Sequence, residues 1–213
     1  MLALYTTVVS SNARKVLAAA IALELKAEIH DVNVYQGEGR TPEYLAINPF
    51  GKVPTLVDGD FVLFESNAIL QYLSEAHGQN RLWASDAKGR ADVARWLFWE
   101  SAHWQPAWTT VMTPFVGHGV RPDLFPKPDE DPDWDDVVLA KDLAFLDGHL
   151  EGRSWLVDER LTLADLSVAA MMTYARICHF PFDKYPSIAA WYGRVEALDA
   201  WKHTTCPLWE PKP

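Results

Sequence analysis

The sequence predicts a small α/β domain followed by an all-helical domain. Strand-like and helix-like segments alternate through about the first 80 residues, and an Asp-Gly pair between two apolar runs is typical of a hairpin. Beyond that point the sequence contains no convincing strand. We therefore expect an α/β domain at residues 1–77, a linker at residues 78–88 and a helical domain at residues 89–213.

The elements of the first domain are expected in the order β-α-β-α-β-β-α. Strands are predicted at residues 2–7, 28–34, 53–57 and 61–64, with the Asp-Gly turn between the last two. Helices are predicted at residues 12–25, from Thr41-Pro42 onward, and from Ser66, as its cap, to about Ala76. The first strand-helix-strand unit predicts a parallel strand pair.

The helical domain is expected to begin with a long helix over residues 86–112, bent at Pro106. Proline and glycine throughout residues 114–132 predict a loop, and further helices are expected at residues 133–150, 162–177 and 186–198. Thr162 and Asp165 are spaced as a capping box, with Leu161 and Leu166 at the positions of a hydrophobic staple. We interpret this motif as structural.

Composition narrows the range of functions. A net charge of −10 argues against a nucleic-acid partner, which requires a basic surface. No early apolar run is long enough to span a membrane, and Arg14 and Lys15 follow the first apolar stretch, unlike in a signal peptide. Cys178 and Cys206 form no disulfide or metal-binding pattern. We therefore expect a cytoplasmic protein with reduced thiols and no membrane partner.

An acidic run at residues 129–136 contains six acidic side chains, some at alternate positions as in a calcium-binding loop. Such a loop has glycine at its sixth position and glutamate at its twelfth, where this chain has Asp136 and Asp142. The seven histidines show no ligand spacing. We therefore expect no metal site, and we interpret the run as a solvated loop before a helix.

Two candidate ligand-binding segments lie close together in the sequence. Pro54 at the start of a strand has two interpretations. It either occupies a strand edge, where proline is tolerated, or is a cis proline that turns the backbone of Val53 towards an extended peptide ligand. Glu65 and Ser66 precede a helix whose unpaired N–H groups suit a carboxylate, while Glu65 suits an ammonium group. The alternative for Ser66 is a plain helix cap.

The third candidate is the turn Ser10-Ser11-Asn12, which leads into the first helix. Small hydroxyl groups beside a helix N-terminus suit an anion such as a thiolate. A free thiol has a pKa of about 8.5, and each unit of lowering needs about 1.4 kcal/mol of preference for the charged form. One hydroxyl and a helix terminus supply about one or two units, and helix capping is again the alternative.

Together these segments resemble cytosolic glutathione S-transferases over essentially the whole chain. The segments that carry the resemblance are Ser10-Ser-Asn-Ala-Arg-Lys-Val16, Asn48-Pro-Phe-Gly-Lys-Val-Pro54, Phe64-Glu-Ser66 and Leu161-Thr-Leu-Ala-Asp165. Each is unspecific alone, but their order and spacing together are specific. The resemblance implies a thioredoxin-like domain followed by a helical domain, and the first segment resembles that of bacterial, serine-type, theta-like members.

The resemblance also implies glutathione as cosubstrate, with a small hydrophobic electrophile as acceptor and hydroperoxide reduction as a further activity. It implies that Val53, beside a cis Pro54, pairs with the cysteinyl backbone of glutathione. Glu65 and Ser66 would hold the γ-glutamyl end, and Lys52 would lie near the glycyl carboxylate. A detoxifying homodimer is the family's usual form.

The residue that activates the thiol stays open among Ser10, Ser11, Tyr5 and Asn12, with Ser10 favoured by the serine-type alignment. The electrophile pocket is expected between the domains, with its wall at His103, Trp104 and Trp108. Two further interpretations are a noncatalytic binding member of the family and a glutathione-dependent isomerase of the zeta type. The second follows from the paired serines, although Asn12 stands where that class has cysteine.

Overall fold

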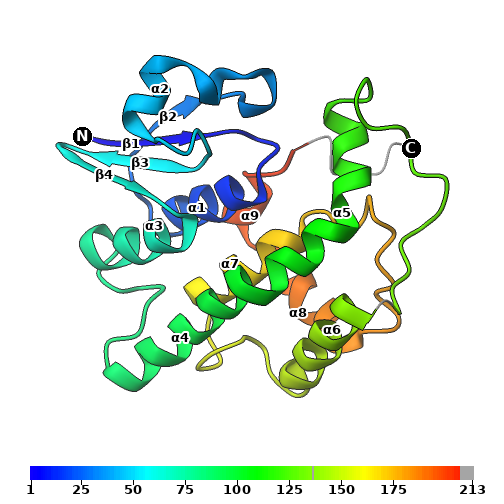
Figure 1. Cartoon of the computed structure of the whole chain (residues 1–213). Helices are drawn as coiled ribbons and strands as arrows, with labels where there is room; N and C mark the ends of the chain where they lie inside the picture. The colour runs from blue at the N-terminus through cyan, green and yellow to red at the C-terminus, as the bar shows by residue number, and fades with distance from the viewer. Residues whose placement is uncertain (136, 207–213) are drawn as a thin grey trace.

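A four-stranded mixed sheet forms the first part of the molecule (Figure 1). The computed structural model describes residues 1–135 and 137–206. The strands, in the sheet order β2-β1-β3-β4, are β2 (Glu28–Asp31), β1 (Leu2–Thr6), β3 (Thr55–Asp58) and β4 (Phe61–Phe64). β1 is parallel to β2, as the strand-helix-strand pattern predicts, and antiparallel to β3. The Asp-Gly turn joins antiparallel β3 and β4.

Helices cover both faces of the sheet. α1 (Ser11–Ala22) and α3 (Ser66–Tyr72) lie on one face, and α2 (Pro42–Ile47) lies on the other (Figure 1). The short 3-10 helices η1 (Val34–Gln36) and η2 (Glu38–Arg40) lead from β2 to α2, and the π-helical turn η3 (Leu73–His77) extends α3. The first part therefore has the predicted α/β architecture.

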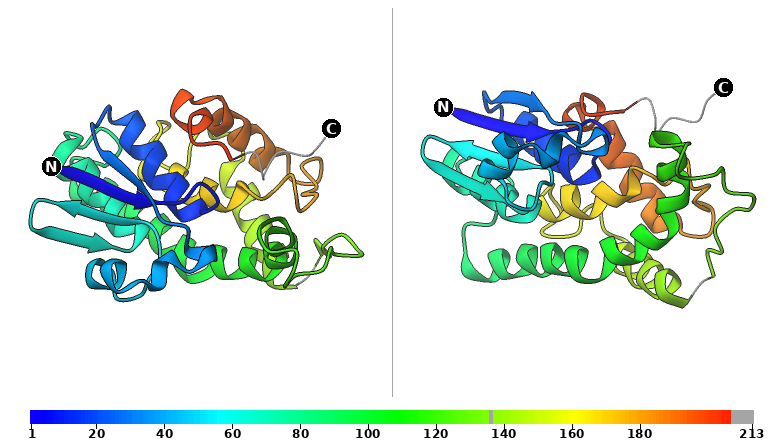
Figure 2. Two further views of the ribbon diagram at one scale, coloured as in Figure 1. Left: turned by 90° about the horizontal axis from the view of Figure 1, so that it is seen from above. Right: turned by 45° about the horizontal axis from the view of Figure 1, so that its top comes forward.

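The second part has helices joined by irregular segments, and its described residues include no strand. One long bent rod consists of α4 (Ala87–Trp99), the π-helical turn η4 (Glu100–Trp104) and α5 (Gln105–Val120). The remaining helices are α6 (Val137–Leu150), α7 (Leu163–Met172), α8 (Pro186–Ala197) and α9 (Asp199–Lys202). All residues of α7 are buried, and Figure 2 shows α1 beside α7 and α9, where the two parts meet.

The capping box before α7 forms as predicted. One carboxylate oxygen of Asp165 accepts hydrogen bonds from the Thr162 N–H at 2.9 Å and the Thr162 hydroxyl at 3.0 Å. The other oxygen accepts from the Leu156 N–H and the Trp191 indole N–H. These four bonds satisfy a fully buried carboxylate.

Several predicted boundaries in the first part and in α7 are wrong. Ser66 is the first residue of α3 rather than its cap, because Glu65 occupies the N-cap position. The second strand ends at Asp31, since the chain turns into a 3-10 helix at Val34. The helix that starts after Thr162 ends at Met172 instead of residue 177, where the backbone changes to turns with i to i+3 bonds.

The predicted loop from Pro114 to residue 132 is partly wrong, because α5 continues through Pro114 to Val120. An interior proline costs about 3 kcal/mol in a helix. Burial of Trp108 and Val116 along α5 offsets that cost. Pro106 lies in the first turn of α5, where proline is tolerated, and the π-helical turn η4 lies immediately before it.

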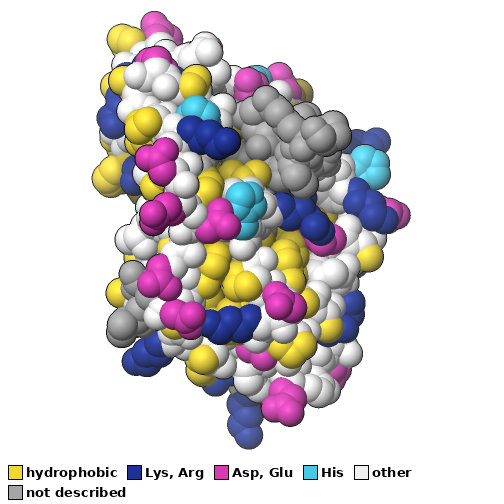
Figure 3. All heavy atoms as spheres, turned by 90° about the vertical axis from the view of Figure 1, so that its right-hand side faces the viewer, with side chains coloured by type: hydrophobic (Ala, Val, Ile, Leu, Met, Phe, Trp, Pro, Cys, Tyr) yellow, Lys and Arg dark blue, Asp and Glu magenta, His cyan; other side chains and the backbone are white. Residues whose placement is uncertain are grey.

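The acidic run follows α5 in an irregular segment. Asp131 pairs with His179 at 2.5 Å, and Asp135 pairs with Lys184. Residue 136 lies outside the described residues. Figure 3 views the molecule from the side of α5, where hydrophobic side chains gather in a hollow edged by charged ones.

Candidate active site

A pocket of about 270 Å³ opens between the sheet and the long helical rod. Its lining comes from the segment before β3, the start of α3, the first turn of α1 and the η4 turn. The lining residues are Asn12, Asn48, Phe50, Lys52, Val53, Pro54, Phe64, Glu65, Ser66, Asn67, Glu100, Ser101 and Gln105. The pocket therefore brings together all five predicted glutathione-binding residues and one of the four predicted thiol activators.

The segment before β3 presents backbone groups to the pocket. The Val53-Pro54 peptide bond is cis. The Lys52 carbonyl accepts hydrogen bonds from the Tyr44 hydroxyl at 2.7 Å and the Asn48 amide at 2.9 Å, which fixes the segment from behind. Within the described part of the chain, the N–H and C=O groups of Val53 have no partner. This half-buried edge is available to an extended peptide.

The start of α3 supplies the polar end of the pocket. Glu65 has a positive φ of 72° and makes no side-chain capping bond, so its exposed carboxylate remains available. The first N–H groups of a helix lack intrahelical partners and carry partial positive charge. The Ser66 hydroxyl donates to Oδ1 of Asn12 at 3.2 Å, which ties the start of α3 to the start of α1.

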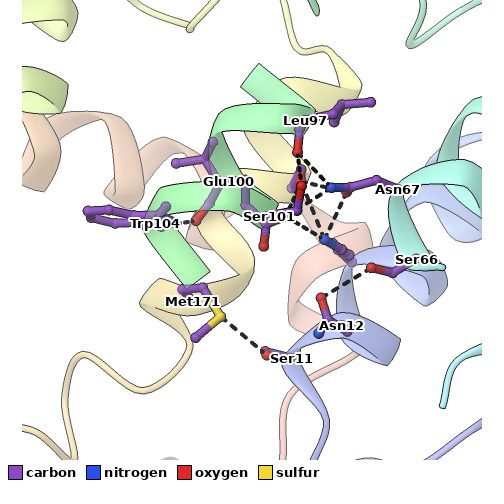
Figure 4. Close-up of polar contacts among 12 residues, drawn as sticks. Ser11, Asn12, Ser66, Asn67, Leu97, Glu100, Ser101, Trp104 and Met171 are labelled. Carbon is purple, nitrogen blue, oxygen red and sulfur yellow. Dashed lines mark hydrogen bonds and ion pairs between the residues drawn. The ribbon is translucent and has the colours of Figure 1, made fainter. Parts of the chain in front are cut away.

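A buried polar network lies directly behind the pocket (Figure 4). The Lys15 ammonium contacts Glu100 Oε2 at 3.1 Å and Asn67 Oδ1 at 2.8 Å, and both charged side chains are fully buried. The Asn67 amide donates to the same Glu100 oxygen at 2.9 Å, and the Ser167 hydroxyl donates to Asn67 Oδ1 at 2.8 Å. Burial lowers the pKa of Lys15, and Glu100 opposes that shift.

The second carboxylate oxygen of Glu100 is the notable exception in this network. Glu100 Oε1 is buried and has no hydrogen-bond partner within the described residues, although Glu100 lines the pocket. An unsatisfied buried carboxylate oxygen costs about 1–3 kcal/mol or more. A ligand group that donates a hydrogen bond at this point removes that cost.

The three polar residues at the turn into α1 have different surroundings. Ser10 is the N-cap of α1, and its hydroxyl oxygen accepts from the Ala13 N–H at 3.2 Å. The buried Ser11 hydroxyl is directed away from the pocket, 3.6 Å from the sulfur of Met171 (Figure 4). Asn12 lines the pocket, and its amide N–H groups have no partner among the described residues.

The other predicted site residues lie outside this pocket. The Tyr5 ring stacks on His30 with the ring centres 4.6 Å apart. Trp104 and Trp108 are fully buried in the helical part, and the Trp104 indole donates to the Val168 carbonyl at 3.0 Å. His103 is exposed and close enough to Asp142 to help lower the pKa of that carboxyl, which burial raises overall.

The π-helical turn explains why the pocket wall differs from the prediction at His103, Trp104 and Trp108. A π turn contains one residue more than an α turn, which rotates the following side chains by about 100°. In consequence Gln105, which follows the turn, lines the pocket, whereas Trp104 packs into the core. Sequence analysis therefore missed Asn67, Glu100, Ser101 and Gln105, together with Asn48, Phe50 and Phe64. The available signals of a buried polar site were Lys15, on the apolar side of α1, and Glu100, which follows four apolar residues.

The N-terminal domain model of glutathione S-transferases matches residues 1–75, and the C-terminal domain model of the same family matches residues 100–199. The chain belongs to the glutathione S-transferase family. Human glutathione S-transferase theta-2B is 34% identical over 205 residues, which cover 92% of this chain and 81% of that protein. Glutathione S-transferase F10 of Arabidopsis thaliana is 28% identical, covering 96% of both chains.

Solved structures of glutathione S-transferases share the fold. A delta-class glutathione transferase from Nilaparvata lugens superposes with a TM-score of 0.83 at 29% identity, covering 98% of this chain and 97% of that one. Glutathione transferase F7 from Populus trichocarpa superposes with a TM-score of 0.82 at 28% identity, covering 96% and 97%. The chain is thus a glutathione S-transferase with a thioredoxin-like domain and a helical domain. Within its described residues, no helix has the length and apolar character needed to cross a membrane.

Proposed function

We propose that this glutathione S-transferase conjugates glutathione to a small hydrophobic electrophile, with hydroperoxide reduction as a further activity, and that the pocket beside Val53 holds glutathione. The observation that carries the proposal is the matched set of groups in one pocket. An unpaired backbone edge, a helix N-terminus, two carboxylates and a lysine correspond to the peptide backbone, carboxylates and ammonium group of a γ-glutamyl tripeptide.

The γ-glutamyl end belongs at the start of α3. Its α-carboxylate accepts hydrogen bonds from the first N–H groups of the helix, beginning with the Ser66 N–H. Its ammonium group lies between Glu65 and the unsatisfied Oε1 of Glu100. This arrangement satisfies the buried carboxylate oxygen that has no partner within the described part of the chain.

The remaining parts of the tripeptide extend along the segment before β3. The cysteinyl backbone pairs with the N–H and C=O of Val53, in the manner of strand addition. The glycyl carboxylate lies near the exposed ammonium group of Lys52. This direction places the cysteine sulfur towards Asn12 and the N-terminus of α1.

The thiol proton leaves with the help of the α1 N-terminus. We assign the main stabilising role to the Asn12 amide, because Asn12 lines the pocket and its N–H groups are available. Ser10 is the second candidate, since its oxygen caps the helix while its hydroxyl hydrogen has no acceptor among the residues that the structure describes. Ser11 and Tyr5 have less support, because their side chains contact Met171 and His30 instead.

In the proposed reaction the thiolate sulfur forms a bond to an electrophilic carbon, and the leaving group departs with its electron pair. The thiol proton passes to solvent, so the enzyme supplies a lowered thiol pKa and a fixed orientation. We propose a homodimer in the cytoplasm as the working form. Noncatalytic binding and zeta-type isomerisation are the alternatives, and turnover on electrophiles distinguishes them.

Binding of unreactive S-methylglutathione, measured by isothermal titration calorimetry, tests the pocket. We expect Glu65→Gln and Glu100→Gln each to weaken binding about tenfold or more, since each removes a charged hydrogen-bond acceptor. Glu75→Gln is the matched control, because Glu75 is exposed and lies outside the pocket. Equal affinity for the wild type and both pocket variants contradicts the proposed site.

The ultraviolet absorbance of bound glutathione thiolate, followed against pH, tests the activator. We expect Asn12→Ala to raise the thiol pKa by about one unit, equivalent to about 1.4 kcal/mol, and to slow conjugation of an electrophile such as chlorodinitrobenzene. Ser10→Gly removes the hydroxyl but keeps an acceptable N-cap. A thiol pKa that moves only in Ser10→Gly transfers the role to Ser10. Binding without turnover on a panel of electrophiles supports the noncatalytic alternative.

A further inference from the structure

A second pocket lies where α1 meets α7, α8 and α9, at the junction that Figure 2 shows. It has a volume of about 130 Å³ and shares no lining residue with the glutathione pocket. The lining residues are Arg14, Thr173, Arg176, Tyr192, Glu196, Trp201, Lys202 and Thr205. None of these residues has a part in the proposed conjugation reaction.

Arg14 forms the floor of this pocket and is only 7% exposed. Its guanidinium group lies 4.2 Å above the Trp201 ring and donates to uncharged oxygens alone, those of Thr173, Trp201, Thr204 and Thr205. In the described part of the chain no carboxylate lies within ion-pair distance of it. Burial lowers the pKa of Arg14, and the Glu196 carboxylate, which lies beyond ion-pair distance, opposes that shift only in part.

The groups around the guanidinium are hydrogen-bond donors. The Thr173 and Thr205 hydroxyl oxygens accept from Arg14, so each hydroxyl hydrogen is left to donate elsewhere. Neither hydroxyl hydrogen has an acceptor among the described residues. Nη1 of Arg14 also carries a second hydrogen beyond the one directed at Thr173. The pocket thus presents three donors around one positive charge.

The rim adds further positive charge. Arg176 and Lys202 are both exposed there. Glu196 is the one acidic lining residue, and Nη2 of Arg176 donates to both of its oxygens, at 3.0 and 2.9 Å. Lys202 pairs with Asp199 at 3.5 Å, so the three lining cations against Glu196 and Asp199 leave a formal charge of +1, although the whole chain carries −10. This local excess favours an anion.

We propose that this pocket binds a small tetrahedral oxyanion of the phosphate or sulfate class. The pocket has about half the volume of the glutathione pocket, about 130 Å³ against about 270 Å³, and its donors surround one guanidinium group, which suits a small ion. The anion accepts from the two threonine hydroxyls and from Arg14, and it supplies the missing counterion. It thereby holds α1 against the helical domain, two residues beyond Asn12.

Thermal unfolding in sodium phosphate, compared with sodium chloride at equal ionic strength and pH, tests the proposal. A ligand that binds only the folded state raises the Tm by an amount that increases with the ratio of ligand concentration to Kd. We expect phosphate and sulfate to raise the Tm beyond chloride, and phosphate to shift the Trp201 indole N–H resonance in a saturable manner. The Trp201→Phe variant identifies that resonance.

The double variant Thr173→Val with Thr205→Val removes two donors while conserving side-chain shape. We expect it to lose at least half of the phosphate-specific Tm increase, and Lys202→Gln to weaken phosphate binding severalfold. Lys88→Gln, which changes an exposed lysine outside the pocket, should keep the full increase. No phosphate effect beyond chloride, or an undiminished effect in the double threonine variant, overturns the proposal. Saturating S-methylglutathione should leave the phosphate effect unchanged, so this test is independent of the glutathione site.

Discussion

Lys15 and Glu100 form an ion pair with no exposed side-chain surface, and each comes from a different domain. A buried pair of this kind contributes little net stability compared with apolar residues of similar size, but removal of one partner leaves an unpaired buried charge. Glu100 also lines the glutathione pocket. If that pocket holds glutathione as proposed, the pair serves folding and binding in different ways, which variants can separate.

We predict that Lys15→Met lowers the free energy of unfolding by about 3–5 kcal/mol, because it leaves Glu100 buried without its cation. The double variant Lys15→Met with Glu100→Leu should recover most of this loss. The double variant should nevertheless bind S-methylglutathione at least tenfold more weakly than the wild type, because the ammonium acceptor is absent.

Urea unfolding measures the first effect, and calorimetry measures the second. If stability and glutathione binding recover together in the double variant, Glu100 does not contact the ligand. If neither variant loses stability, the ion pair contributes nothing to the fold.

At the scale of elements, the β3–β4 hairpin is attached to the helix that follows it. Oδ2 of Asp58 accepts from the Tyr72 hydroxyl at 2.9 Å and lies 2.7 Å from Nε2 of His77. The hydrogen bonds from Tyr72 and then His77 lower the pKa of Asp58. This small cluster joins the end of β3 to the end of α3 and to η3.

The lowered pKa gives a defined pH dependence. An ionised Asp58 is favoured in the folded state, so its contribution to stability is present above the unfolded pKa of about 3.9 and is lost as the pH falls through the lower folded value. We predict that the fall in Tm between pH 6 and pH 3 is smaller in Asp58→Asn than in the wild type. Asp60→Asn, a change at the exposed neighbouring turn, should show the same fall in Tm as the wild type.

Sequence patterns predicted some of these elements and not others. Periodicity and turn residues predicted the four strands, the parallel β1–β2 pair, the β3–β4 hairpin and the cap before α7, because these depend on local chemistry. The β1–β3 pairing that joins the two halves of the sheet was not predicted. The π-helical turn η4 has no local signature, so the rotation that directs Trp104 into the core and Gln105 to the pocket was not predictable. The five residues assigned to glutathione binding came together in one pocket because they lie on two adjoining segments.

At the scale of the whole molecule, several large apolar side chains remain on the surface of the single chain. Phe98 on α4 is 71% exposed, Phe50 before β3 is 56% exposed, and Phe61 on β4 is 43% exposed. Single exposed apolar side chains are common on proteins, and only a contiguous apolar patch marks an association surface. Phe98, the most exposed of the three, is the position at which we test the homodimer proposed above.

We predict that Phe98→Lys shifts the molar mass measured by light scattering from about twice the chain mass of 24.0 kDa towards that of one chain. A lysine in an apolar interface buries an unpaired charge, which weakens association. Leu124→Lys is the matched control, because Leu124 is 62% exposed but lies in the loop after α5. A wild type that already has the mass of one chain contradicts the homodimer.

The backbone conformation of Glu65 is unfavourable, which affects the substitutions that selection favours at this position. A φ of 72° is unfavourable for any residue with a Cβ by about 1 kcal/mol or more, and glycine avoids that cost. Selection for heat resistance alone should therefore favour glycine at position 65. Selection for glutathione use should restore glutamate at the same position. The residue at position 65 therefore indicates whether heat resistance or glutathione use was the stronger selection.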